Sequence, residues 1–186
     1  MGKTYDALDD RLISFIKAQK LFFVATAPLR ADGHVNLSPK GYDSFAVIGP
    51  NEVAYLDLGG SGIETQAHLQ ENGRITIMFC AFEGAANILR LYGQGEAVDF
   101  DHPDFEKMLA LFPGYDRARA IIRVKVSRVQ DSCGWGVPFY EFKAEREQLK
   151  RYIDKDEFND ESRQKWREYN AASIDGLPGL KGPDQS

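Results

Sequence analysis

Short runs of alternating apolar and polar residues, separated by turn residues, fill most of the first 130 positions of the chain. The clearest run is 120–129, where Ile122, Val124 and Val126 alternate with charged or hydroxylated neighbours, so one face of the strand is apolar and the other is wet. Gly, Pro, Asn and Asp cluster between the runs, as they do in tight turns. Strands are therefore predicted over residues 21–27, 34–41, 44–49, 52–58, 74–82, 88–100 and 120–129.

Few helices interrupt these strands. Thr4 is expected to cap a first helix that begins at residue 5. Ser61 and Glu64 have the spacing of a capping box at the start of a second helix, near residue 63, and Gly73 is expected to end that helix. Strand, turn and strand otherwise repeat without the regular crossovers of a parallel sheet. This order predicts a mainly β fold of the α+β class, built as an antiparallel barrel or meander. It argues against a doubly wound sheet. The expected helices, where apolar residues recur at steps of three and four, cover 5–16, 63–70 and 103–112.

The pattern changes after Phe142. Acidic and basic residues alternate densely over 145–169, with sparse apolar anchors, which predicts one or two solvent-facing helices that dock on the preceding domain. The Gly- and Pro-rich end, 176–186, is expected to fray. We therefore expect a barrel domain over 1–142 and a charged helical extension with a Gly/Pro-rich tail over 143–186.

Composition narrows the class of protein. The chain has 186 residues, 43% hydrophobic and 27% charged, as is usual for one globular domain with an extension. Its 23 basic and 28 acidic side chains give a formal net charge of −5, which disfavours binding to nucleic acid. Two cysteines make no disulfide framework, no run reaches the roughly 18 apolar residues of a membrane span, and the charged start lacks a signal region. We expect a cytoplasmic protein that binds neither nucleic acid nor membrane.

Signatures of metal, nucleophile and dinucleotide sites are missing from the sequence. The three histidines and two cysteines show no pair at ligand spacing, and no G-x-S-x-G or G-x-G-x-x-G string occurs. We therefore expect no metal site and name no catalytic residue. Arg90 lies in the middle of a predicted strand, where an unpaired charge is costly, so it is expected to have a carboxylate or phosphate partner.

A glycine-rich loop over 56–65, LDLGGSGIET, leads from a strand end into a helix start. Free backbone N–H groups at such a start attract an anion, and glycines allow its oxygens to approach closely. Ser61 and Thr65 add hydroxyl donors, and Lys40, at the end of the preceding hairpin, adds charge. A phosphate site and simple capping by Ser61 and Glu64 both remain open, because the Glu64 carboxylate would repel a phosphate.

The string SCGWGVP, residues 132–138, predicts a loop of fixed shape that presents one large aromatic ring, Trp135. The ring can stack on a planar ligand, or it can pack in an interface or core. From the spacing alone, packing is the default interpretation.

Five strings of this chain resemble, in their order and spacing, the pyridoxamine 5'-phosphate oxidase-like family of FMN-binding split barrels. The resemblance covers about residues 5–140, and SPKG followed by CGWGVP is typical of one branch of that family. The strings are NLSPKG (36–41), YLDLGGSGIET (55–65), RITIMFCAF (74–82), ILRLYGQGEAV (88–98) and SCGWGVP (132–138).

The resemblance implies a six-stranded antiparallel split β-barrel that pairs into a homodimer, with FMN at the subunit interface. It implies that the strand ending in SPKG flanks the flavin, that the strand-to-helix turn holds the phosphate, and that an aromatic ring reaches the flavin from the partner subunit. The cofactor-binding residues implied in this way are Asn36, Ser38, Lys40, Leu58, Ser61, Gly62, Thr65 and Trp135.

The chain departs from the family's oxidases of pyridoxamine phosphate in two places. Those enzymes carry an Arg-rich phosphate grip and a C-terminal R-L-H-x-R-type segment. Here the grip is reduced to Lys40 with hydroxyl and backbone donors, and FYEFKAERE stands near the place of the C-terminal segment. Vitamin B6 is therefore not the expected substrate, and a deazaflavin is an alternative to FMN.

The expected function is that of an FMN-dependent oxidoreductase whose small-molecule substrate or electron donor the sequence does not name. One alternative is a non-catalytic flavin- or haem-binding carrier or sensor. Another is a ligand-free dimeric barrel whose glycines only shape its loops.

Overall fold

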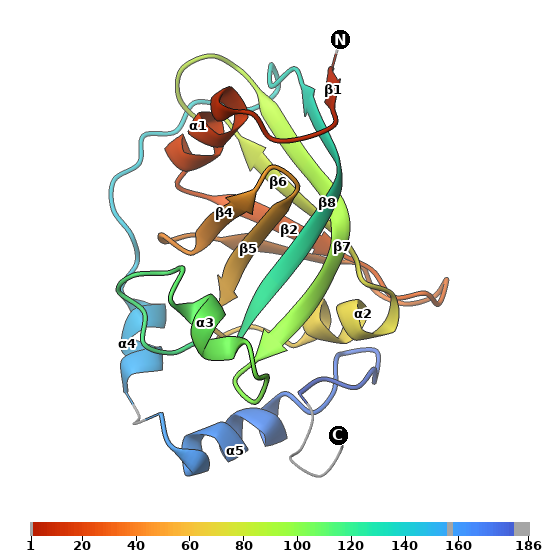
Figure 1. The fold of residues 1–186 in the computed structure, drawn as a ribbon, viewed down its shortest axis with the longest axis vertical. Coiled ribbons are helices and arrows are strands. Elements are labelled where there is room, and N and C mark those ends of the chain that lie inside the picture. Colours follow the sequence, from red (N-terminus) through yellow and green to blue (C-terminus); the bar gives the residue numbers. More distant parts are fainter. Residues whose placement is uncertain (1, 156–157, 181–186) are drawn as a thin grey trace.

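One antiparallel sheet, curled into a split barrel, forms the centre of the computed structural model, which describes residues 2–155 and 158–180 (Figure 1). Along the sheet the strands follow the order β3-β2-β6-β7-β8-β5-β4, and β1 pairs with the end of β8. The predicted fold class is confirmed, with eight strands in place of six. Their bounds are β1 Thr4–Tyr5, β2 Phe22–Thr26, β3 Asn36–Lys40, β4 Phe45–Gly49, β5 Glu52–Asp57, β6 Arg74–Cys80, β7 Ile88–Asp99 and β8 Ala120–Ser132.

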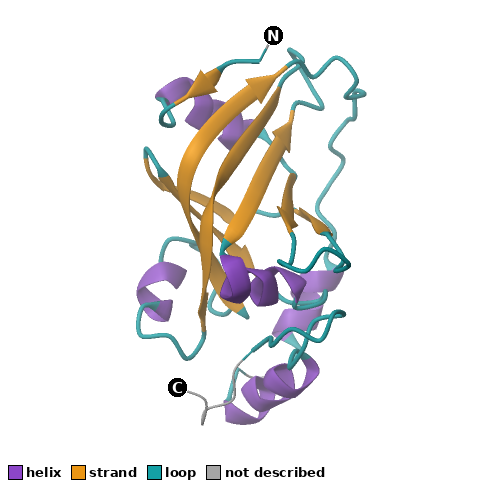
Figure 2. Ribbon diagram, turned by 90° about the vertical axis from the view of Figure 1, so that its right-hand side faces the viewer, coloured by secondary structure: helices purple, strands orange, loops and turns teal. Residues whose placement is uncertain are grey.

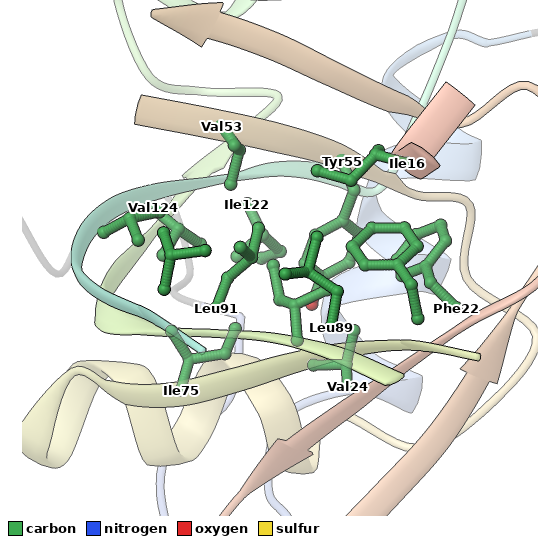
Figure 3. Packing of buried hydrophobic residues seen from close by; sticks show 14 of the residues in the cluster. Ile16, Phe22, Val24, Val53, Tyr55, Ile75, Leu89, Leu91, Ile122 and Val124 are labelled. Carbon is green, nitrogen blue, oxygen red and sulfur yellow. The ribbon is translucent and has the colours of Figure 1, made fainter. Parts of the chain in front are cut away.

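The main hydrophobic core fills the inside of the curled sheet (Figure 3). The alternation predicted for β8 is confirmed, because Ile122 and Val124 are fully buried whereas Lys125 is exposed. Leu91 on β7 lies on the same inner face and is also fully buried. The aromatic rings of Phe22, Phe45, Tyr55 and Phe79 pack against one another at one end of this core, with ring centroids 5.0–5.7 Å apart.

A second apolar cluster lies on the outer side of β5 and β8, under α3 (Phe105–Leu109). It includes Phe100 and Leu109 and receives Ile153 and Leu180 from the C-terminal region. Two extension helices, α4 (Gln148–Asp154) and α5 (Asp160–Tyr169), pack at this end of the barrel. Figure 2 shows α1 (Asp10–Ala18) at the opposite end of the barrel. The helices predicted for the charged extension are thus present and anchored by sparse apolar side chains.

A close approach between β7 and β8 requires a glycine at position 93. The register of the two strands shifts between Tyr92 and Gly93, which marks a local irregularity in the long strand. A Cβ atom at Gly93 would collide with the backbone carbonyl of Lys125. Gly93 therefore lies at an irregularity of β7 that leaves no room for a side chain.

The start of the chain differs from its prediction. The sequence predicts Thr4 as the cap and Tyr5 as part of the first helix, but both residues form β1, which pairs with residues of β8 about 125 positions later. The helix begins only at Asp10, and Asp9, not Thr4, caps it by accepting a hydrogen bond from the backbone N–H of Leu12 at 2.8 Å. The spacing of apolar residues here fits both a helix start and a short strand. Only the long-range pairing with β8 makes residues 4–5 a strand.

The second helix, α2 (Glu64–Asn72), also begins differently from its prediction. Its N-cap is Ile63, and no side chain caps it, so Ser61 and Glu64 do not form the predicted capping box. The predicted end is correct, because Gly73 takes a left-handed conformation, with φ of 70°, and its N–H donates to the carbonyl of Leu69.

The described part of the tail packs on the molecule, and the prediction that it frays is wrong for residues 176–180. Leu180 is buried, and the N–H groups of Gly179 and Leu180 donate to the carbonyls of Ala171 and Asn170. Residues 181–186, where the same prediction continues, lie outside the described part of the chain. None of the helices in the described ranges is long and apolar enough to cross a membrane.

We expect the inner core to dominate the stability of the barrel. Substituting Leu91→Ala removes a fully buried side chain and is expected to lower the free energy of unfolding by about 2–5 kcal/mol. The control Leu29→Ala, at a position 63% exposed, is expected to change it by less than about 0.5 kcal/mol. Urea denaturation followed by circular dichroism measures both, and equal losses would contradict this placement of the core.

Candidate functional site

The polarity of β3 is inverted relative to an ordinary half-buried strand. Asn36, Ser38 and Lys40 are half-buried, whereas Leu37 and Pro39 are exposed. The three polar side chains face the same way as Phe22, Val24 and Thr26 of β2, their direct partners in the sheet. Because β3 ends the described sheet order and pairs only with β2, its polar face lies along an open edge of the barrel.

A network of hydrogen bonds joins this polar face to the start of α2. The Asn36 side-chain amide donates to the hydroxyl oxygens of Thr65, at 3.0 Å, and Thr26, at 3.3 Å. The Ser38 hydroxyl donates to the Asn36 amide oxygen at 3.0 Å. The Thr26 hydroxyl in turn lies 2.9 Å from Nδ1 of His68. The structure thus brings together three of the predicted site residues, Asn36, Ser38 and Thr65.

Several buried polar atoms at the start of α2 have no hydrogen-bond partner within the described ranges. They are the hydroxyl of Tyr55, the amide oxygen of Gln66 and Nε2 of His68. Burial raises the pKa of Tyr55 well above its ordinary value and lowers the pKa of His68, so both groups are neutral at pH 7. Unsatisfied buried polar atoms are uncommon, and their concentration next to Thr65 is typical of a functional region.

A buried ion pair between Asp57, at the end of β5, and Arg119, just before β8, lies behind the glycine-rich loop. Both side chains are 3% exposed, and two guanidinium nitrogens donate to the carboxylate at 3.0–3.2 Å. Gln66 also donates to this carboxylate at 3.0 Å, and the N–H of Gly59 donates at 3.2 Å. Burial opposes ionisation of Asp57, but Arg119, followed by Lys40, outweighs it and holds the pKa of this carboxyl well below its ordinary value. Lys40 is thus within electrostatic range of Asp57.

The loop at 59–62 is held by its carbonyl groups. Arg119 donates to the carbonyl oxygens of Ser61, at 2.9 Å, and Gly62, at 3.1 Å. Gly59 and Gly60 both have positive φ, of 77° and 83°, which other residues adopt only with strain. The backbone N–H groups of Gly60, Ser61 and Gly62 donate to no group within the described residues. The loop therefore presents donors, which suit an anion.

A second carboxylate, that of Glu64, also lies at this loop. The Glu64 side chain folds back beside Gly62, where it occupies the space that a Cβ atom on Gly62 would need. Its Oε1 accepts a hydrogen bond from the N–H of Ile174 at 3.3 Å, so the tail holds this negative charge at the start of α2. This carboxylate weakens the attraction that the helix start has for a phosphate.

A cavity of about 720 Å³ opens on the other side of the loop, and we refer to it as the extension cavity. One wall is the loop 59–62 with Arg117 and Arg119, and the facing wall is formed by α4, Phe158 and α5. Ser61 and Gly62 belong to this wall, whereas Asn36, Ser38, Lys40 and Thr65 do not. Asn170, just after α5, accepts a hydrogen bond from Arg119 at 2.7 Å and so fastens the extension to the loop.

The remaining two predicted residues lie apart from the polar network. The Leu58 side chain is buried in the outer apolar cluster, so only its backbone faces the loop. Trp135 is 87% exposed in the loop after β8. Asp57 pairs with Ala120 at the start of β8, and Trp135 follows its end at Ser132, so the 13 residues of β8, roughly 40 Å of strand, separate Trp135 from the glycine-rich loop.

Several residues that shape this region were not identified from the sequence. Arg119 and Asp57 are 62 positions apart, and no local pattern indicates that they meet. The sequence signal for Arg119 is its position directly before the apolar residues 120–122, where a strand buries one face and a charge requires a partner.

Arg90 has a different partner from the carboxylate or phosphate that the sequence predicts. Its guanidinium donates to the hydroxyl of Ser132 at 3.0 Å.

A curled antiparallel sheet with a polar edge strand and a glycine-rich loop before a helix defines a split-barrel protein, and comparisons with known proteins agree. A family model described as pyridoxamine 5'-phosphate oxidase matches residues 8–133. The chain is 37% identical over 192 residues to the pyridoxamine 5'-phosphate oxidase family protein ustO of Aspergillus flavus, and the match covers 95% of this chain and 77% of that protein. The chain therefore belongs to the pyridoxamine 5'-phosphate oxidase family.

Solved structures with the same fold are more distant in sequence. A protein of Lactobacillus delbrueckii that carries the name of a pyridoxamine 5'-phosphate oxidase matches with a TM-score of 0.53 at 20% identity, over 67% of this chain and 94% of that one. HupZ of Group A Streptococcus matches with a TM-score of 0.52 at 22% identity, over 66% and 91% of the two chains. These similarities establish the fold.

The buried ion pair generates a prediction about stability. Asp57→Asn leaves Arg119 charged and uncompensated in the interior and is expected to lower the free energy of unfolding at pH 7 by about 3–5 kcal/mol. Because the folded-state pKa of Asp57 is depressed, its stabilising contribution is present above the unfolded-state pKa, near 3.9, and is lost as the pH falls below that value.

The difference between wild type and Asp57→Asn is therefore expected to shrink below about pH 4. Denaturant titrations of both proteins at pH 7, 5 and 3 measure it. A difference that stays constant down to pH 3 would contradict the ion pair.

Proposed function

We propose that this protein is a flavin-dependent oxidoreductase that binds FMN at the polar face of β3 and the glycine-rich loop. The observation that carries the proposal is the inverted polarity of β3, whose side chains Asn36 and Ser38 are tied to Thr65 at the start of α2. An edge strand that turns polar side chains toward the barrel gains no core packing from them. A polar ligand at this edge accounts for the pattern.

The residues present fit the chemistry of a flavin. Within the described sheet one side of the β3 backbone is unpaired. Its free carbonyl groups and the N–H groups that remain beside Pro39, which has no N–H, suit donors and acceptors on the edge of an isoalloxazine ring. Thr65 accepts from Asn36 and still has a hydroxyl hydrogen to donate. For the phosphate we assign Lys40, Thr65, the backbone of Leu58, and the N–H groups of Ser61 and Gly62.

When bound, a flavin supplies hydride or electron transfer at its ring system, and the protein supplies placement and electrostatics. In this chain Asn36 and Ser38 orient polar hydrogens along β3. Asp57 stays ionised at neutral pH, which keeps a fixed negative charge near Lys40. Because burial keeps His68 neutral, we assign no proton transfer to the described cluster.

A second copy of the chain is part of the proposal. In a single chain Trp135 lies at the far end of β8 from the glycine-rich loop, and its ring is almost fully exposed. An exposed indole that does not reach its own site suits a homodimer in which the partner's Trp135 covers the flavin. We propose this arrangement together with the flavin site.

The direct test is a titration of the purified protein with FMN and with riboflavin, which lacks the phosphate. FMN is expected to bind stoichiometrically, and Lys40→Gln is expected to weaken FMN binding by roughly tenfold while leaving riboflavin binding unchanged, because one charge-assisted contact to the phosphate is lost. Lys17→Gln, which removes an exposed charge at the end of α1, is the matched control.

Calorimetry and the quenching of flavin fluorescence give the affinities. Anaerobic addition of NADPH then shows whether the bound flavin is reduced, which separates an oxidoreductase from a carrier. No binding of FMN or of a deazaflavin would falsify the proposed function.

The position of Glu64 gives a second prediction for the same site. Glu64→Gln keeps the acceptor for the Ile174 N–H but removes a negative charge from the start of α2, so it is expected to tighten FMN binding by about two- to fivefold. Riboflavin affinity is expected to stay the same. Glu106→Gln, in the first turn of α3, is the control. A phosphate site placed away from the start of α2 would show no gain with Glu64→Gln.

A further inference from the structure

A chain of hydrogen bonds runs from a buried histidine in α2 to the polar face of β3. Nδ1 of His68 lies 2.9 Å from the hydroxyl oxygen of Thr26. The Thr26 oxygen accepts from the side-chain amide of Asn36 at 3.3 Å, and the amide oxygen of Asn36 accepts from the Ser38 hydroxyl at 3.0 Å. His68 is fully buried and Ser38 is half-buried, so the chain connects the interior to the face where we place the ligand.

The donors of this chain determine its direction. Both hydrogens of the Asn36 amide are used, because the amide donates to Thr65 at 3.0 Å as well as to Thr26. Thr26 is therefore an acceptor toward Asn36, and His68 is the remaining partner for its own hydrogen within the described residues. Nδ1 of His68 is then the bare nitrogen, and the single hydrogen of the neutral ring is on Nε2.

The other tautomer of His68 fits this arrangement less well. With the hydrogen on Nδ1, His68 donates to Thr26, whose own hydrogen is then left without an acceptor among the described residues. Nε2 has no partner in the described ranges in either case. The Nε2–H tautomer thus leaves one buried group unsatisfied and the Nδ1–H tautomer leaves two, and each such group is costly.

Reversing the whole chain would give the ligand the opposite surface. In the reverse direction His68 donates to Thr26, both threonines donate to the oxygen of a rotated Asn36 amide, and the hydrogen of Ser38 is free. In the direction that the structure shows, the Ser38 hydrogen is used by Asn36, so the Ser38 oxygen offers only lone pairs. Thr65 keeps a hydrogen to donate. The two directions exclude each other, and His68 has a different tautomer in each.

The burial of His68 keeps its ring in the neutral form that this argument requires. Burial lowers the pKa of His68, whereas the carboxylates of Asp175, Glu64 and Glu71 oppose the effect and are outweighed by it. A protonated ring would donate from both nitrogens and would leave the Thr26 hydrogen without an acceptor. A neutral ring with one hydrogen can therefore hold the chain in one direction.

We propose that His68 is a positioning residue, whose Nε2–H tautomer fixes the direction of this chain and so makes Ser38 an acceptor and Thr65 a donor toward the ligand. The site then selects a ligand with an N–H group opposite Ser38 and an anionic oxygen opposite Thr65. Without a ligand, the Thr65 hydrogen can turn toward the unpartnered hydroxyl of the neighbouring Tyr55. The assignment of the N–H group to a flavin imide rests on the proposed function, whereas the direction of the chain rests on the network alone.

Nitrogen NMR of the free, full-length protein tests the direction, because long-range ¹H–¹⁵N spectra show which nitrogen of a neutral histidine carries the hydrogen. The chain has three histidines, and the other two, His34 and His102, are exposed. The double variant His34→Gln/His102→Gln therefore leaves only the signals of His68. We expect the Nε2–H tautomer at pH 8. The Nδ1–H tautomer would overturn the proposal, whether or not a flavin binds.

Asn36→Asp tests the coupling along the chain, because it replaces the amide donor by a second acceptor. Thr26 is then expected to turn its hydrogen toward the new carboxylate, and His68 is expected to change to the Nδ1–H tautomer. Gln70→Glu, an exposed change in α2 that adds a negative charge outside the chain, is the matched control and is expected to keep Nε2–H. An unchanged tautomer in correctly folded Asn36→Asp, or the same change in both variants, would contradict the coupling.

The ligand preference is tested with riboflavin and its N3-methyl derivative, which lacks the imide N–H. Riboflavin is expected to bind about tenfold more tightly, and Ser38→Ala is expected to reduce this preference about three- to tenfold. The steric cost of the methyl group is common to both proteins, so the change reports the hydrogen bond. The control Ser14→Ala, at an exposed position of α1, is expected to keep the full preference.

The outcomes separate this inference from the proposed function. If riboflavin binds and Ser38→Ala leaves the preference unchanged, the acceptor role of Ser38 is wrong and the flavin site stands. If neither flavin binds, the proposed function fails, and the tautomer of His68 with its response to Asn36→Asp still decides whether His68 directs the chain.

Discussion

The ion pair of Asp57 and Arg119 organises the part of this molecule where we propose the flavin site. Its guanidinium contacts Asp57, two loop carbonyls and the Asn170 side chain. Removing two charges from water is expensive unless each is paired and hydrogen-bonded on all sides. Here that condition is met only when β5, β8, the loop 59–62 and the residue after α5 are all in place. One interaction therefore couples the barrel, the loop and the extension.

The same constraint gives the glycine-rich loop its chemical character. A loop of this kind can turn either its carbonyl or its N–H groups outward. Because Arg119 holds the carbonyls of Ser61 and Gly62 from behind, donors remain for a ligand. The positive φ of Gly59 and Gly60 allows the chain to reverse within this short distance. The side chain that stabilises the fold thus also sets the sign of the charge that the loop attracts, against the opposing effect of Glu64 and an acidic chain.

The sequence predicted what depends on local pattern and missed what depends on distance. The alternation in β8 and the turn at 49–51 are visible within ten residues, and the strands predicted there are correct. The pairing of β1 with β8 and the contact between Asp57 and Arg119 join residues far apart, so neither leaves a local trace. For the candidate site, the glycine-rich loop itself indicates Thr65, whereas Asn36 is implied only by the family resemblance. Their hydrogen bond, and the use of Arg119 to hold the loop, are visible only in three dimensions.

The charged extension illustrates how composition can mislead about structural role. Its sequence is typical of a solvated helix pair with a loose end, yet three separate polar contacts fasten it to elements of the candidate site. Asn170 meets Arg119, the N–H of Ile174 meets Glu64, and Asp175 accepts from the backbone N–H of His34 in the turn before β3. These contacts reach the loop, the start of α2 and the hairpin that carries the polar edge strand. An extension held only for solubility would need none of them. Its attachment to all three elements makes it a structural part of the region where we propose the flavin site.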